Sequence, residues 1–327
     1  RTNDDSIATV DEAGIVTAQG PGDTHVITFY DNGIAATPVI FPVSNRVGPA
    51  YPKVAAPTEI DRLVVAKLRT LGIEPSGLCT DEEFLRRVRL GLTGSLPTPD
   101  EIADFVSDRA KEKRAKKVNE LLGRPTYAAW MTTRLCDWLG NAEANLPVGG
   151  EQNMRSEKSS LWYDWIYRRV DENMAYDQLV EGMVLAVGRL PEQTDDEYFA
   201  EMTSYFREEN PADYSQRSYT PFFWSRGRFS LPQAQRFSYA FLGVRLECAE
   251  CHKHPYDQWT QADYQDFQTF FEGVRYRYSS TRGEVKALKE KLGLTADQDS
   301  GGYKRLFSDL AHSGTIVPWG EVVAPDC

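Results

Sequence analysis

The sequence predicts a mainly α-helical protein: a multi-helix domain with a small β-sandwich segment at its N-terminus. One observation is a change in the pattern of apolar residues along the chain. Short β-branched runs between turn residues fill residues 1–45, whereas apolar residues at helical spacing dominate residues 58–273. Another is a set of helix-start and helix-stop signals in the later part. A Pro-, Ala- and Gly-rich stretch, residues 46–57, is expected to link the two parts.

Four short runs in residues 1–45 are expected to form strands: IATV, GIVTA, THVITFY and AATPVIFPV. The pair Asn32-Gly33 between the last two runs is the strongest short hairpin signal. Four strands in so short a segment make a thin sandwich at best.

Local signals place the helices. Thr58 is expected to cap a helix that ends at Gly72, and residues 80–83 and 98–101 have the spacing of capping boxes. Within the polar loop 187–230 we expect one short helix near 195–208. The mixed C-terminal segment 274–327 is expected to contain a helix near 283–292. Further helices are expected at about 113–122, 127–139, 158–172, 175–186, 231–246 and 261–272.

Composition limits the partners. The net charge is −11, from 37 basic and 48 acidic residues, which argues against nucleic acid or an anionic membrane as the main partner. The sequence has no run of eighteen apolar residues, so no membrane span is expected.

The stretch ECAECHKHPYDQW, residues 247–259, contains two of the five cysteines and two of the four histidines. Cys-x-x-Cys-His (CxxCH) is the signature of covalent haem attachment. In such sites two thiols bond to the vinyl groups of one porphyrin edge, and the histidine ligates the iron. Cys248 and Cys251 are therefore the candidate thioether residues of haem c, and His252 is the candidate iron ligand.

Two other interpretations stay open. Cys248, Cys251, His252 and His254 could supply four zinc ligands, although adjacent residues such as Cys251 and His252 do not easily converge on one small ion. The cysteines could also form a small disulfide loop. A thioredoxin-like redox pair is less favoured, because such a pair needs a strand–helix context and this one is expected at the end of the helix 231–246.

Several residues could complete a haem site. His254 is expected to hydrogen-bond a propionate or a backbone carbonyl, since it is too close to His252 to reach the opposite face of the ring. Arg245 and Arg236 could pair with propionates. The aromatic run Phe222–Trp224 could line a haem or form plain core. A sixth ligand would come from a histidine or a methionine, or the sixth position would stay vacant. The methionines are otherwise expected in the core: Met131, Met154, Met174, Met183 and Met202.

Two resemblances extend these predictions. The text ATVDEAGIVTAQGPGDTHVITFY resembles the second half of a bacterial immunoglobulin-like domain of the second group. This resemblance implies an extracytoplasmic location and a spacer or adhesive role. The first strands of such a domain are missing, so we expect the native protein to extend beyond the N-terminus.

The stretch FLGVRLECAECHKHPYDQWTQADYQDFQTFF resembles the end of the planctomycete cytochrome C-associated domain of unknown function. IDRLVVAKLRTLGIEPS, LRRVRLGLTGSLPTPDEIADFV and YDWIYRRVDENMAYDQLVEGMV resemble its earlier parts, so the likeness covers about residues 58–272. Lys253 replaces the usual Asp of this family, and Ala175 replaces a usual Pro. A further domain normally follows in the family, so we expect one after this chain as well.

These observations favour an extracytoplasmic c-type haem protein, either periplasmic, at the cell surface or secreted. It would act in electron transfer or redox chemistry with an unidentified redox partner protein. The alternatives are a non-haem metal-binding enzyme and a cell-surface structural or interaction module without a redox role. The sequence identifies no catalytic residue. Cys79 and Cys136 could form a disulfide in such a compartment.

Overall fold

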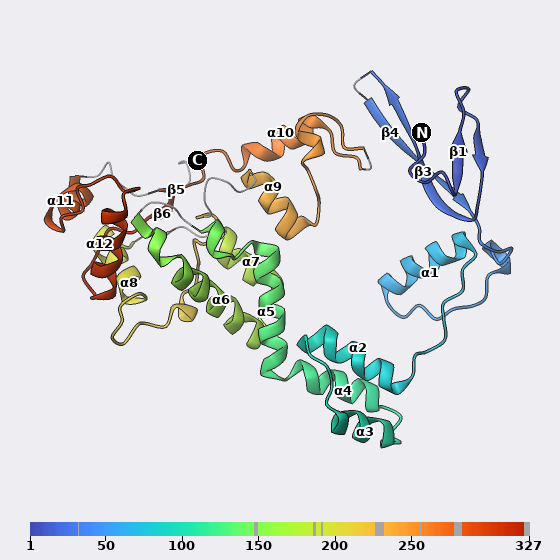
Figure 1. The fold of residues 1–327 in the computed structure, drawn as a ribbon, viewed down its shortest axis with the longest axis horizontal. Helices are drawn as coiled ribbons and strands as arrows, with labels where there is room; N and C mark the ends of the chain where they lie inside the picture. Colours follow the sequence, from blue (N-terminus) through green and yellow to red (C-terminus); the bar gives the residue numbers. More distant parts are fainter. Residues whose placement is uncertain are drawn as a thin grey trace. The chain divides into compact units, whose positions relative to one another are not determined.

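The computed structural model describes residues 1–31, 33–146, 150–185, 188–190, 192–225, 232–255, 257–277 and 283–323. These residues contain twelve α-helices and six short strands, so the prediction of a mainly α-helical protein is confirmed (Figure 1). The chain forms two compact units. The first unit contains Arg1–Thr80 and Arg245–Phe267, and the second contains Asp81–Val244 and Gln268–Cys327.

The four predicted strands of the first unit all form, but they pair as two separate antiparallel sheets, β1 with β2 and β3 with β4. The strands are β1 (Ala8–Val10), β2 (Val16–Ala18), β3 (Gly22–Tyr30) and β4 (Gly33–Phe41). The described residues do not show the predicted sandwich. Ala8 and Ile27 are buried, whereas Phe29 and Tyr30 are exposed, so little apolar surface joins the sheets. Asn32 of the predicted turn lies outside the described residues.

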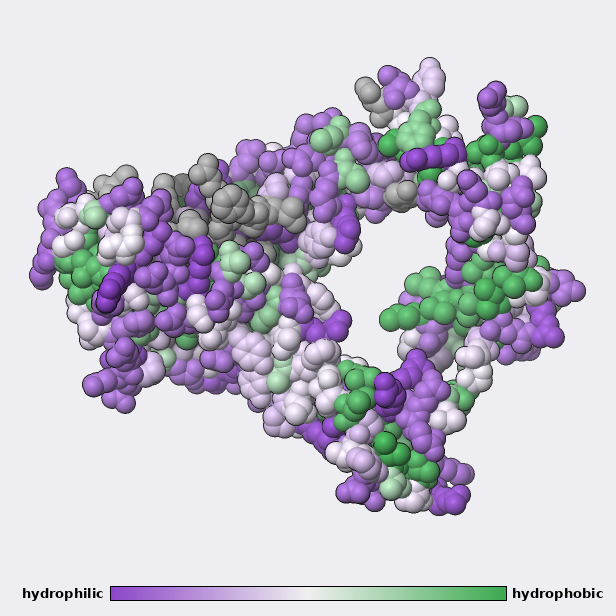
Figure 2. Space-filling model, viewed as in Figure 1, coloured by the Kyte–Doolittle hydropathy of each residue, from purple (hydrophilic) through white to green (hydrophobic). Residues whose placement is uncertain are grey.

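Helix α1 (Glu59–Leu71) begins and ends where the sequence predicts. Thr58 and Asp61 exchange hydrogen bonds between side chain and backbone N–H, which makes a capping box. Gly72 ends the helix with φ of +68°, a conformation that favours glycine. The surface over α1 is apolar (Figure 2), because three of its side chains are more than half exposed: Ile60, Leu63 and Val64.

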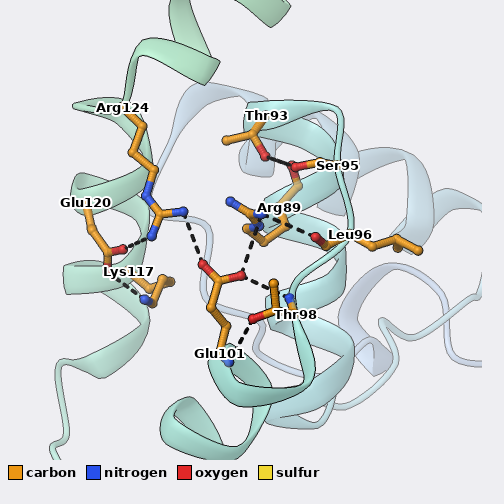
Figure 3. Close-up of polar contacts among 9 residues, drawn as sticks. All are labelled: Arg89, Thr93, Ser95, Leu96, Thr98, Glu101, Lys117, Glu120 and Arg124. Atoms are coloured by element: carbon orange, nitrogen blue, oxygen red, sulfur yellow. Dashed lines mark hydrogen bonds and ion pairs between the residues drawn. The ribbon is translucent and has the colours of Figure 1, made fainter.

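The second unit begins with a group of four helices in which α2 contacts each of the others. The helices are α2 (Asp81–Thr93), α3 (Pro99–Ser107), α4 (Lys113–Leu122) and α5 (Pro125–Leu139). Thr98 and Glu101 form the predicted capping box of α3. The Glu101 carboxylate also lies 3.1 Å from Nη1 of Arg124 and 3.6 Å from Nη2 of Arg89 (Figure 3). One carboxylate thus joins α2, α3 and the residue before α5.

The first core of this unit surrounds α6 (Arg155–Asp171), which packs against α5. Helix α7 (Tyr176–Val184) approaches closely, because Gly182 has no side chain and a Cβ there would lie 2.8 Å from the ring of Trp165. The aromatic run Phe222–Trp224 is buried in this core, so these rings serve packing.

A second core lies between α8 (Asp195–Ser204), α11 (Gly283–Lys291) and α12 (Gly301–His312). The sequence predicts α8 and α11 but misses α12. A short antiparallel pair, β5 (Arg275–Arg277) with β6 (Glu321–Val323), is also new.

A buried ion pair joins distant parts of the second unit. Glu151, in the 3₁₀ helix η3 (Gly150–Met154), contacts the amine of Lys158 on α6, and both side chains are 0% exposed. The Glu151 carboxylate also accepts hydrogen bonds from the Tyr276 hydroxyl and from the Gly320 N–H, both at 2.9 Å. Burial lowers the pKa of the Lys158 amine. Glu151 therefore links η3, α6, β5 and the residue before β6.

The predicted helix 231–246 is wrong in its second half. Helix α9 (Gln233–Phe237) passes into the π-helical turn η5 (Ser238–Leu242), and Gly243 ends it with φ of +64°. The Cys-x-x-Cys-His motif therefore does not lie at the end of a long helix. Helix α10 (Gln261–Thr269) follows the motif. The remaining 3₁₀ helices outside the motif are η1 (Gly48–Ala50), η2 (Glu143–Asn145) and η4 (Tyr214–Gln216).

Within the described ranges, no helix combines the length and the apolar character that crossing a bilayer requires.

Candidate functional site

The Cys-x-x-Cys-His segment forms a tight turn of its own in the first unit. The 3₁₀ helix η6 (Cys248–Glu250) begins it, and the N–H groups of Cys251 and His252 lie 3.4 Å and 3.2 Å from the Cys248 carbonyl oxygen, to which both donate. Ala249, inside the turn, is buried, which fixes the turn against its surroundings. The two cysteines and the histidine therefore come from little more than one turn of backbone.

The ring of His252 is held by a backbone carbonyl. Its Nδ1 lies 2.7 Å from the carbonyl oxygen of Lys253. Because a carbonyl oxygen can only accept, Nδ1 must bear the hydrogen, and a neutral imidazole then has its lone pair on Nε2. Metal-binding histidines are commonly held in this way, with the second ring nitrogen donating to a carbonyl or carboxylate.

The two motif thiols are exposed and form no disulfide in the structure. Cys136 differs from them. It is buried in the second unit, its Sγ lies 3.4 Å from Nδ2 of Asn141, and burial raises the pKa of its thiol to about 11. The disulfide between Cys79 and Cys136 is not formed, and Cys327 lies outside the described residues.

After the motif, the backbone folds back on itself. The N–H of His254 donates to the carbonyl oxygen of Trp259 at 2.8 Å, and Nε1 of Trp259 donates to Asp257 at 3.1 Å. These bonds close a small loop directly beside His252. Tyr256 lies outside the described residues.

The start of α10, which the sequence predicts correctly, supports this loop through a capping box that the sequence analysis did not identify. Thr260 and Asp263 exchange hydrogen bonds as a capping box, and the Gln261 side chain donates to the carbonyl oxygen of Glu250 at 3.2 Å. The Thr260 backbone N–H lowers the pKa of the Asp263 carboxyl. The spacing Thr-x-x-Asp was a readable signal for this helix start.

The two candidate arginines belong to different units. Arg245 is exposed and lies three residues before Cys248 in the first unit. Arg236 lies on α9 in the second unit, where burial lowers the pKa of its guanidinium. It lines a cavity of about 400 Å³ together with Arg275.

The four-ligand zinc interpretation gains no support. Across the part of the chain that the structure describes, no group of three or more His, Cys, Asp or Glu side chains is arranged to hold a metal ion. A haem iron needs no such group, because the porphyrin supplies four of its ligands.

A family comparison covers both the helical part and the motif. The model of the family PSCyt2, described as a protein of unknown function (DUF1549), matches residues 59–276. The chain belongs to this family. No curated protein and no solved structure matches it.

The PSCyt2 match runs from the first residue of α1 into β5 and includes the motif. It confirms the predicted resemblance to a domain of unknown function over about residues 58–272. The strands β1 to β4 lie outside the match. The PSCyt2 description assigns no activity, so a function has to be argued from the site.

Proposed function

We propose that the chain is an extracytoplasmic c-type haem protein that acts in electron transfer or redox chemistry. The observation that supports this best is the orientation of His252, whose Nδ1 faces the Lys253 carbonyl oxygen at 2.7 Å. This leaves Nε2 for an iron ion, within one turn of two exposed thiols. The residues present therefore fit haem c.

Each residue of the turn has a role in this proposal. The sulfurs of Cys248 and Cys251 form the thioether bonds, and Nε2 of His252 ligates the iron. The Lys253 carbonyl orients the imidazole. In this proposal the exposed Arg245 would pair with a propionate, and His254 would hydrogen-bond one. Haem, when bound, supplies one-electron chemistry at its iron.

The location and the finer family assignment are part of the same proposal. The hairpin segments β1–β2 and β3–β4 are consistent with part of an immunoglobulin-like module, which is typical of extracytoplasmic proteins. The helical part would be the planctomycete cytochrome C-associated domain. Covalent haem attachment takes place outside the cytoplasm, which agrees with this location, and a separate redox protein would be the partner.

The test is expression in a host with an intact c-type maturation system, followed by a pyridine haemochrome assay after acid-acetone extraction. We expect haem to stay on the protein, and to be lost in the double variant Cys248→Ala, Cys251→Ala. Cys136→Ala is the matched control, because this thiol is buried in the other unit, and it should retain haem.

A chain free of haem, made beside a control cytochrome that is fully loaded, would contradict the proposal. Metal analysis of that chain would then separate the two alternatives. A stoichiometric metal without porphyrin would favour the non-haem metal-binding enzyme. A metal-free chain would favour the structural or interaction module.

A further inference from the structure

We propose that a cavity between α6, α7 and the segment Ser215–Tyr219 binds a small zwitterion of amino-acid size, with Arg169 for its carboxylate and Glu181 for its ammonium group. The cavity lies within the second unit and has a volume of about 360 Å³. This volume is at the lower end of the range of about 300–1,000 Å³ that is typical of small-molecule sites, so the ligand is small. The site is separate from the Cys-x-x-Cys-His turn and does not depend on haem.

Arg169 supplies the cation of this site. The residue lines the cavity and is only 7% exposed, and its guanidinium stacks on the ring of Trp165 at 3.5 Å. Its Nη1 donates to the carbonyl oxygens of Trp165 and Ser215, at 2.9 Å and 3.1 Å, and its Nη2 donates to that of Arg217 at 2.6 Å. These bonds use three of the five N–H groups of a guanidinium, so two remain for a ligand.

The charge of Arg169 has no carboxylate partner within the residues that the structure describes. Glu172 also lines the cavity, but its carboxylate is paired with Arg168 at 2.9 Å. Burial lowers the pKa of the Arg169 guanidinium to about 10, which leaves it a cation at neutral pH. Because a buried charge is normally paired, a ligand carboxylate is the group that this guanidinium lacks.

Glu181 supplies the anion. It is exposed on α7 and lines the same cavity, and no Lys, Arg or His side chain in the described ranges is paired with it. A carboxylate only accepts hydrogen bonds, so an ammonium group is the donor that complements it. The cavity therefore offers one unpaired charge of each sign. This favours a zwitterion over a phosphate, which would be repelled by the carboxylates of Glu172 and Glu181.

The segment Ser215–Tyr219 forms a fixed wall of the cavity. The Arg217 carbonyl oxygen accepts a hydrogen bond from Nε1 of Trp165 at 2.8 Å in addition to the one from Arg169. Nη1 of Arg217 in turn donates to the carbonyl oxygen of Tyr219 at 3.1 Å. A wall that is held in this way before the ligand arrives lowers the entropy cost of binding.

Side chains of this wall and of α7 supply further contacts. Gln178, Ser218 and Tyr219 line the cavity, and the side-chain polar groups of all three have no hydrogen-bond partner in the part of the chain that the structure describes. The Tyr219 ring and the Met174 side chain add partly buried apolar surface. A ligand with a polar head and a short apolar side chain matches this lining.

The experiment is a calorimetric titration of the full chain with each of the common L-amino acids. The amino acid that binds most tightly is then compared with two analogues, one without its amino group and one without its carboxylate. We expect each analogue to bind at least about tenfold more weakly, because each loses one charge-assisted hydrogen bond.

Variants of the chain test the two ends of the site. Glu181→Gln should weaken binding of the amino acid about tenfold and leave binding of the deaminated analogue unchanged. Asp177→Asn is the matched control, because Asp177 is exposed on the same helix and does not line the cavity. Arg169→Lys should weaken both ligands, provided that circular dichroism shows an intact fold. If this variant does not fold, the analogues and Glu181→Gln still decide the matter.

Several results would overturn the inference. One is that no amino acid binds to the full chain. Another is that either analogue binds as tightly as the amino acid itself, since one of the two charges would then be irrelevant. Equal losses in Asp177→Asn and Glu181→Gln would also overturn it, because they would indicate a general effect of charge on α7 and no direct contact.

Discussion

Replacing Glu151 with alanine should destabilise the second unit by about 3–5 kcal/mol, because breaking a buried ion pair leaves an uncompensated charge. The Glu151 carboxylate has three partners in the structure. These are the Lys158 amine, the Tyr276 hydroxyl and the Gly320 N–H, the last two at 2.9 Å. The variant leaves all three donors without this acceptor, and the Lys158 amine and the Gly320 N–H are buried.

The magnitude follows from these contacts. Each neutral donor that loses its acceptor costs about 1–3 kcal/mol. Because burial lowers the pKa of Lys158, the amine can lose its proton in the variant, which limits the cost of its charge. We therefore expect a loss nearer about 3 than about 5 kcal/mol. Glu120→Ala is the matched control. Glu120 pairs with Lys117 and Arg124 at the surface, where such contacts contribute less than about 1 kcal/mol.

The assay is urea unfolding followed by tryptophan fluorescence, since Trp162 and Trp319 are buried in the cores of this unit. The double variant Glu151→Gln, Lys158→Met should recover part of the loss, because it removes the charge and keeps one acceptor. A loss in Glu151→Ala no larger than that in Glu120→Ala would refute the reasoning.

Three further outcomes are expected. In the haem-free chain, iodoacetamide should label exposed Cys248 much faster than Cys136, whose burial raises its pKa to about 11; similar rates by peptide mass mapping would contradict this. The Thr98 N–H lowers the pKa of the Glu101 carboxyl in the folded protein. The ionised Glu101 therefore stabilises the fold fully at pH values above its unfolded pKa of about 4.3. This stabilisation is lost as the pH falls through the lower pKa of the folded state. The free energy of unfolding of Glu101→Gln, measured in urea, should therefore approach that of the wild type in acid. A difference between the two that does not change with pH would contradict this prediction. Gly182→Ala places a Cβ 2.8 Å from a tryptophan ring of α6. This variant should lower the free energy of unfolding, measured by thermal denaturation, by about 1–3 kcal/mol. An unchanged melting temperature would show that α7 can shift away from the ring.

The helices that could be predicted well are those whose signals are local. Thr58 and Gly72 bound α1, and Thr98 with Glu101 begins α3, because capping depends on residues within one turn. The segment 238–242 was predicted as α-helix, since its sequence SYAFL has no breaker. There the rings of Phe237 and Phe241 pack against each other. Phe271 and Phe223 lie against them as well. These contacts are tertiary, and no local pattern encodes them.

Helix α12 was missed because its first residues are typical of a loop. It begins at Gly301-Gly302, a pair that is typical of loops, although Ser300 caps it and Tyr303 and Phe307 face the core. Tertiary packing of these rings outweighs the low helix propensity of glycine.

The candidate site shows the same division between local and distant contacts. The spacing of Cys248, Cys251 and His252 identifies the motif without any structure. The partner of the His252 ring is a backbone carbonyl, that of Lys253, and a carbonyl leaves no mark in a sequence. Nor does any spacing relate Glu151 to Gly320, which lie 169 residues apart.

That long separation has a consequence for synthesis of the chain. The contact of Gly320 with Glu151 and that of the Tyr198 hydroxyl with the Gly320 carbonyl span 169 and 122 residues, so both close only after almost all of the second unit has been made. Contacts of this range form late because the loop entropy must be overcome first. During translation, Lys158 and the rings around Trp319 are therefore made before their partners, and Cys248 and Cys251 are made while this unit is still incomplete. If haem is attached as proposed, its attachment and the completion of the core would compete in time, and chaperones that delay folding should favour attachment.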